Sequence, residues 1–114
     1  MKKITHGAIV LVDVPVSAYK HVHAGRHFYL LCSNEKACAF SPVIQVLPFS
    51  SKNRRLPVQP EVEAECFTKK SFALAEQLTL LPRDILEQGK YCGTLPPASM
   101  KKVKEAIKIQ LALD

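Results

Sequence analysis

The sequence predicts a small, mainly β protein: an antiparallel sheet of mostly short strands, with helical segments near residues 82–88 and at the C-terminus. Three observations predict this fold class. The apolar runs are short and rich in β-branched and aromatic residues, prolines and polar turns separate them, and only the last stretch shows a clear helical period. The chain has 114 residues, which is the size of one domain, so we expect a single domain over residues 1–114.

Three strands are expected in the first half of the chain. The first is GAIVLVDVPV at residues 7–16, the second is HFYLLCS at 27–33 and the third is PVIQVLPF at 42–49. Because Pro48 has no N–H to donate, it should lie at a sheet edge or a bulge. Residues 17–27 are expected to form a surface loop, and the Asn-Glu-Lys at 34–36 is expected to form a turn.

The second half is less regular. Residues 50–55 (SSKNRR) are expected to form an exposed basic loop, and residues 56–65 an extended segment interrupted by Pro57 and Pro60. Residues 71–81 fit a strand by alternation and a helix by propensity, so the pattern leaves both open. From Ser99 onward, apolar residues recur at helical spacing beneath a lysine-rich face, which predicts an amphipathic terminal helix.

Composition narrows the functional classes. The net charge of +6 and the isoelectric point of about 9.3 fit a polyanionic partner. The apolar stretches are far shorter than the roughly 20 residues of a membrane span, and no secretion signal is evident, so we expect a cytoplasmic protein. Cysteines at positions 32, 38, 66 and 92 have neither zinc-ligand spacing nor an export signal, so we expect reduced, buried thiols. Phosphate-loop, dinucleotide-binding and zinc-hydrolase motifs are absent from the sequence.

Two short segments carry the residues with functional chemistry. His21, His23, Arg26 and His27 lie together before or in the second strand, and a basic Ser-Ser-Lys loop follows the third. If adjacent strands bring these segments together, Lys and Arg could bind RNA phosphate while a histidine transfers protons. From these residues alone a solvated polar loop is the simpler explanation, and His21 and His23 lack the third partner that a metal site needs.

Several strings along the chain resemble the MazF/PemK family of toxins. They are GAIVLVDVPV, GRH followed by an apolar strand and SN, AFSPVIQVLPFSSK, RLPVQPEVE, the EQ pair and MKKVKEAIKIQLAL. They occur in the family's order from Gly7 to Leu113, and the FSP strand with its Ser-Ser-Lys is the most specific of them.

This resemblance implies an SH3-like twisted antiparallel barrel of the MazF/PemK/CcdB type with a C-terminal helix. It also implies a homodimeric toxin inhibited by a cognate antitoxin, with no membrane association. The implied activity is sequence-specific cleavage of single-stranded RNA without a metal ion or other cofactor, in which the ribose 2′-hydroxyl attacks its own phosphate.

The resemblance also implies the site residues. The family's catalytic arginine aligns with His27, the preceding basic position with Arg26, and the catalytic Thr or Ser with Ser50, whose hydroxyl could donate to a phosphoryl oxygen. The other predicted RNA-binding positions are His23, Ser51, Lys52, Arg54, Arg55, Glu76, Gln77 and Thr79.

Three departures from the family pattern concern the basic residues. His27 replaces arginine and Phe28 replaces the proline after it, Val22 and His23 replace a Glu-Gln pair, and Thr79 stands where a further arginine is expected. Because a histidine has fewer donors than a guanidinium and can be neutral, the first change is not conservative. Three hypotheses follow: a nuclease that uses His27, a degenerate family member that only binds antitoxin or RNA, and a gyrase-binding toxin, against which the RNase-type strings argue.

Overall fold

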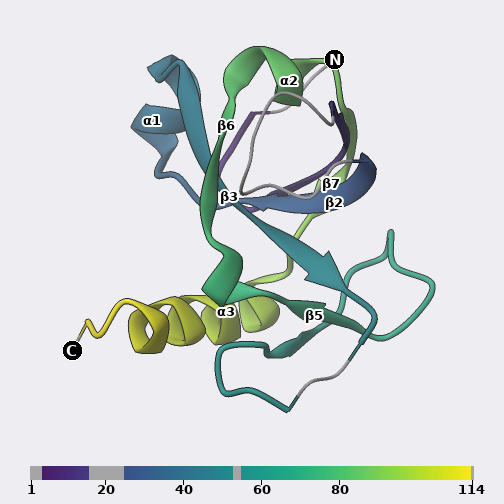
Figure 1. Cartoon of the computed structure of the whole chain (residues 1–114), viewed down its shortest axis with the longest axis vertical. Coiled ribbons are helices and arrows are strands. Elements are labelled where there is room, and N and C mark those ends of the chain that lie inside the picture. Colours follow the sequence, from purple (N-terminus) through teal and green to yellow (C-terminus); the bar gives the residue numbers. More distant parts are fainter. Residues whose placement is uncertain (1–3, 16–24, 53–54, 114) are drawn as a thin grey trace.

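The computed structural model describes residues 4–15, 25–52 and 55–113. Its centre is a strongly curled antiparallel sheet in the order β4-β5-β3-β2-β1-β7, with β6 also paired to β3. The strands are β1 (Ala8–Val14), β2 (Gly25–Leu31), β3 (Val43–Ser50), β4 (Glu61–Val62), β5 (Ser71–Ala73), β6 (Thr79–Pro82) and β7 (Lys90–Thr94). Figure 1 shows the sheet wrapping into a half-barrel, with helix α3 (Pro97–Gln110) beneath it and helix α2 (Arg83–Glu87) at the opposite end. The predicted barrel-like sheet with a C-terminal helix is therefore confirmed.

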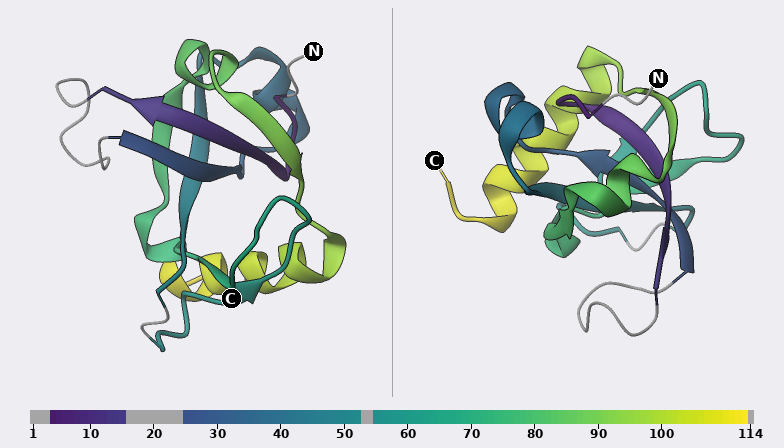
Figure 2. Two further views of the ribbon diagram at one scale, coloured as in Figure 1. Left: turned by 90° about the vertical axis from the view of Figure 1, so that its right-hand side faces the viewer. Right: turned by 90° about the horizontal axis from the view of Figure 1, so that it is seen from above.

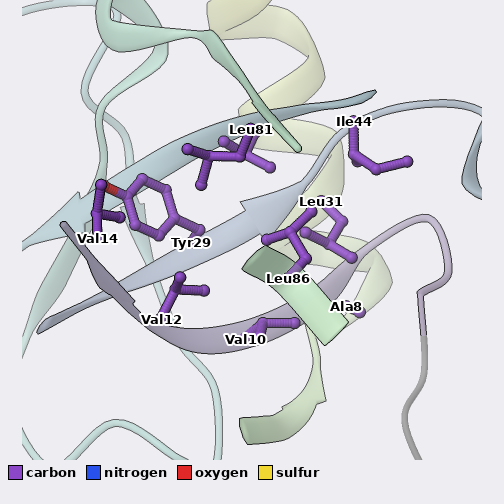
Figure 3. Packing of buried hydrophobic residues seen from close by; sticks show 10 residues of the cluster. Ala8, Val10, Val12, Val14, Tyr29, Leu31, Ile44, Leu81 and Leu86 are labelled. Carbon is purple, nitrogen blue, oxygen red and sulfur yellow. The ribbon is translucent and has the colours of Figure 1, made fainter. Parts of the chain in front are cut away.

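Apolar side chains fill both faces of the sheet, which explains why β1 reads as a nearly continuous apolar run. One face of the strands packs inside the curl together with Leu86 of α2, as Figure 3 shows. The other face packs on α3, with Ile9, Leu30 and Leu47 of the sheet against Met100 and Val103 of the helix. Alternate residues along each strand thus enter different cores.

The structure corrects three local expectations. The segment after Ser33 is not a turn but the short helix α1 (Glu35–Phe40), because Asn34 caps it: its Oδ1 accepts a hydrogen bond from the Ala37 N–H at 2.9 Å. Residues 71–81 are neither one strand nor one helix, but β5, a single 3₁₀ turn η1 (Ala75–Gln77) and β6. Strand β7 was not expected at all.

Pro48 does not lie at a sheet edge as expected. It pairs with Tyr29 of β2 inside β3, the strand that has neighbours on both sides. On the side away from β2, the described part of β3 pairs with β6 up to Val46 and with β5 from Phe49 onward. Pro48 thus falls where β3 changes partners, and a missing N–H costs little there.

Five of the expected elements agree with the structure. The first three strands lie within a few residues of their predicted bounds, a helix occurs near residues 82–88, and α3 presents Val103 and Ala106 to the core beneath an exposed lysine face. Among the described residues, no helix is both long and apolar enough to span a membrane.

Candidate functional site

A pocket opens at the C-terminal end of β3, where the predicted serine lies. Its volume is about 400 Å³, and its lining comes from the middle of β2, the end of β3 with the residue after it, the start of β5 and the loop at residues 63–70: Phe28, Phe49, Ser50, Ser51, Cys66, Phe67, Thr68, Lys69 and Ser71. We call it the Ser50 pocket. In Figure 1 the 63–70 loop lies beside the arrowhead of β3. Aromatic rings, hydroxyls and one ammonium group therefore meet at this end of the sheet.

Three phenylalanines form the apolar part of the Ser50 pocket. Phe67 contacts Phe28 edge-to-face with ring centroids 5.4 Å apart, and it contacts Phe49 at 4.9 Å. Phe67 is held in place by a turn in which its N–H donates to the Ala64 carbonyl at 3.0 Å. All three rings are partly exposed, and they pack against the core over α3.

Ser50 ends β3, where the chain leaves the sheet. Its Cα is paired with Phe72 of β5, and its Oγ accepts a hydrogen bond from the Lys52 N–H at 3.1 Å. Ser51 and Lys52 are exposed, as the basic loop was expected to be. Because a hydroxyl that accepts one bond keeps its own proton to donate, Ser50 can still donate to a bound oxygen.

His27 lies near the start of β2, outside the lining of the Ser50 pocket. It is partly buried and opposite Val12 of β1, and its ring contacts Tyr29 edge-to-face at 6.4 Å. The β2–β3 ladder runs from Leu31–Val46 to Tyr29–Pro48, and two more residues in the same register would bring His27 opposite Ser50. Figure 2 shows instead that the two strands cross and that their ends diverge beyond the ladder.

Arg26 is exposed and, by strand alternation, shares a face of β2 with Phe28 rather than with His27. It stands opposite Asp13 of β1 and lines a second pocket with Asp13 and Lys90. Leu11 of that second pocket is the cross-strand partner of Phe28, so the second pocket adjoins the Ser50 pocket. Arg26 and His27 therefore lie on opposite faces of β2, near its start.

The predicted residues Glu76, Gln77 and Thr79 lie in η1 and at the start of β6, away from the pocket lining. The Glu76 carboxylate accepts a hydrogen bond from the side-chain amide of Gln59, a residue only 4% exposed. Thr79 pairs with Val46 of β3. In the structure Glu76 therefore anchors the segment before β4.

Of the other predicted positions, Arg55 is exposed and adopts a left-handed φ of 56°. His23 and Arg54 lie outside the described residues, as does most of the expected 17–27 loop. Among the described residues, no cluster of three or more potential metal-ligating side chains is found. All four cysteines are free thiols, as expected, but only Cys38 is buried and the other three are partly exposed. Burial next to Cys38 raises the pKa of Cys32 to about 12.

Sequence reasoning missed the residues that the 63–70 loop contributes to the pocket, namely Cys66, Phe67, Thr68 and Lys69. The signal was slight: a phenylalanine followed by Thr-Lys-Lys combines an aromatic ring with basic residues. Only the pairing of β3 with β5 places this loop beside Ser50.

Several solved structures are similar to this chain over nearly its whole length. An endoribonuclease in complex with its cognate antitoxin from Mycobacterial species superposes with a TM-score of 0.79 at 20% identity, covering 96% of each chain. A MazE-MazF crystal structure from Deinococcus radiodurans gives 0.77 at 17% identity, also covering 96% of each chain. The Mycobacterium tuberculosis toxin MazF-mt6 gives 0.75 at 18% identity, covering 92% of this chain and 97% of that one. At these identities the likeness establishes the fold.

The sequence comparisons identify the family. No curated protein sequence matches the chain. The family model for PemK-like, MazF-like toxins of type II toxin–antitoxin systems, however, matches residues 5–111, nearly the whole chain. The chain therefore belongs to the PemK-like, MazF-like toxin family of type II toxin–antitoxin systems.

Proposed function

We propose that this toxin is an endoribonuclease that cuts single-stranded RNA, including mRNA, at short specific sequences without a metal ion. The observation that carries the proposal is the Ser50 pocket, in which a serine hydroxyl lies beside three aromatic rings and Lys69. A hydroxyl donor suits a phosphoryl oxygen, a cation suits phosphate charge and exposed rings suit unpaired bases.

In the proposed reaction the ribose 2′-oxygen attacks the adjacent phosphorus, and the bond from phosphorus to the 5′-oxygen of the next nucleotide breaks. The products are a cyclic phosphate and a 5′-hydroxyl. His27 takes the 2′-hydroxyl proton, and a proton must also reach the departing 5′-oxygen. Ser50 donates to a non-bridging oxygen, while Arg26 and Lys52 supply positive charge. The proposed place for the phosphate is beside Ser50, at the edge of the Ser50 pocket.

We further propose that the toxin is a cytoplasmic homodimer inhibited by a cognate antitoxin. The similar structures support the antitoxin: one endoribonuclease was solved with its cognate antitoxin, and a MazF from Deinococcus radiodurans was solved with MazE. The basic charge of this chain, +6, would favour both an acidic antitoxin peptide and RNA.

The test is primer extension on a long defined RNA incubated with the purified toxin in EDTA. We expect discrete cut positions with the wild-type chain. Ser50→Ala should cut at the same positions roughly a hundred- to thousandfold more slowly, as for the loss of one transition-state donor. A wild-type chain that leaves the RNA intact from pH 5 to 9 would contradict the proposal.

A second function is favoured by one observation, that His27 lies outside the pocket that holds Ser50. In this alternative the site is degenerate, and the chain only binds antitoxin or RNA. A wild-type chain that binds a cognate antitoxin peptide but cuts no RNA would support this alternative.

A further inference from the structure

We propose that the Ser50 pocket binds one nucleobase of the RNA, the base next to the cut phosphodiester, and that Phe67 is the residue on which this base stacks. This inference rests on the proposed nuclease function, because it names the part of the substrate that the pocket recognises. It assigns a specificity-determining role to the 63–70 loop.

The shape and lining of the pocket fit a nucleobase. Its volume of about 400 Å³ lies within the roughly 300–1,000 Å³ of small-molecule sites. The rings of Phe28, Phe49 and Phe67 supply flat apolar surface, and exposed aromatic rings are the usual stacking platforms for unpaired bases. The polar part of the lining, in contrast, holds groups that donate and accept hydrogen bonds.

Those polar groups lie where the edge of a stacked base and its phosphate would be. Ser51 and Thr68 are exposed hydroxyls on the pocket, and Ser71 is a nearly buried one. The Ser51 and Thr68 hydroxyls can donate and accept, and the Ser71 hydroxyl, which donates to the Lys69 carbonyl at 3.2 Å, can still accept, so together they can pair with the edge of any base. Lys69 is exposed on the same lining and supplies one cation for the backbone.

The position of Ser50 connects the pocket to the cleavage reaction. Ser50 is both the proposed donor to the phosphate and a lining residue of the pocket. A base stacked on Phe67 therefore belongs to a nucleotide adjacent to the cut. Because Phe67 is tied to Ala64 and packs on two other rings, the stacking surface is preformed, which lowers the entropy cost of binding.

The test measures binding of RNA that cannot be cut. The probe is a fluorescein-labelled 2′-O-methyl oligonucleotide spanning the cut position mapped by primer extension, with an abasic nucleotide placed at each position in turn. With the wild-type chain, one position next to the cut should lose affinity roughly tenfold or more when abasic, as expected for one stacked base. With Phe67→Leu, an abasic nucleotide at that position should lower the affinity no more than an abasic nucleotide at a neighbouring position.

Melting temperatures and a second pocket variant keep the test independent of folding. Phe67→Leu removes two ring contacts, so its melting temperature is measured alongside. Thr68→Trp changes an exposed rim residue and fills the pocket from outside, so it should weaken binding of the intact probe while leaving the melting temperature unchanged. Lys69→Gln should lower the affinity for every probe equally and reduce the number of ions released on binding by about one. Lys36→Gln, on the exposed face of α1, should change neither quantity.

Three results would overturn the inference. One is an abasic profile that is the same for the wild type and both pocket variants. Another is that Phe67→Leu weakens binding of a cognate antitoxin peptide but leaves RNA binding unchanged, which would assign the pocket to the peptide. The third is Thr68→Trp binding the probe like the wild type.

Failure of the nuclease proposal is distinguishable from failure of this inference. If the wild type cuts no RNA, a 2′-O-methyl pool of random octamers replaces the mapped probe. A Phe67-dependent affinity for that pool would preserve the pocket assignment, and a Phe67-independent affinity would reject it.

Discussion

At the scale of single residues, the sequence predicts Ser50 in the loop just after the third strand, whereas the structure makes it the last, partly buried residue of β3; its catalytic role stays a prediction. The aromatic side of the same pocket was not predicted. Ser50 could be located because it follows a recognisable strand, whereas Phe67 reaches the pocket through the pairing of β5 with β3, which local sequence does not encode.

The two basic residues of β2 make separate predictions because they occupy opposite faces. His27→Ala should lower the single-turnover cleavage rate by roughly a hundred- to ten-thousandfold, as expected for loss of proton transfer. Arg26→Lys should keep most of the rate, since it retains a charge near phosphate. If His27→Ala cuts like the wild type while Arg26→Ala abolishes cutting, His27 is not the proton acceptor and the essential basic residue lies on the face of β2 that carries Arg26.

Cys32 makes a prediction about pH. Its Sγ donates to the Leu30 carbonyl at 3.5 Å, and burial together with nearby Cys38 raises its pKa to about 12. Because only the thiolate reacts, iodoacetamide labelling of native Cys32 should stay negligible near pH 8 and increase as the pH rises above about 10. Mass spectrometry of the labelled peptides measures this, with guanidinium-unfolded protein as the control. Labelling of native Cys32 at the unfolded rate at pH 8 would contradict the assigned burial.

At the scale of elements, strong local patterns were predictable and partner-dependent ones were not. Strands β1 to β3 are marked by β-branched apolar runs, and α3 by its amphipathic period. Residues 71–81 alternate like a strand, but the chain leaves β5 at Leu74 and turns once through η1 so that β6 can join another part of β3. Nothing in the local pattern predicts such a switch.

The short helix α1 depends on a side chain from a distant element. The Arg83 guanidinium donates to the carbonyls of Ser41, at 2.8 Å, of Ala37, at 3.2 Å, and of Cys38. These bonds satisfy the Cys38 and Ser41 carbonyls at the C-terminal end of α1, and they add a second donor to the Ala37 carbonyl, which also accepts from the Ser41 N–H at 2.8 Å.

Replacing this arginine should therefore destabilise the protein. We expect Arg83→Met to lower the free energy of unfolding by about 1–3 kcal/mol in urea titration, because it leaves partly buried carbonyls unpaired. Lys104→Met, on the exposed face of α3, is the matched control and should change it by less than about 0.5 kcal/mol. Equal stabilities of the two variants would show that Arg83 does not hold α1.

At the scale of the whole molecule, the curl of the sheet determines how the proposed site is arranged. A flat sheet in the same register would bring His27 and Ser50 face to face. In the curled sheet β2 and β3 cross, so the start of β2 and the end of β3 diverge beyond their paired residues. The family and barrel-like fold were predictable because the matching strings extend over nearly the whole chain, but the crossing of β2 and β3 and the Ser50 pocket required the structure.

The central claim is that this toxin cuts RNA through the 2′-hydroxyl of the nucleotide at the cut. Its most direct test is a defined RNA in which that single 2′-hydroxyl is replaced by hydrogen, incubated with the wild-type chain in EDTA and analysed by gel for fragments and end groups. The account predicts that the unmodified RNA yields a 5′-hydroxyl and a cyclic phosphate, and that the modified RNA stays intact at that position. Cleavage of the 2′-deoxy RNA at an undiminished rate would contradict it.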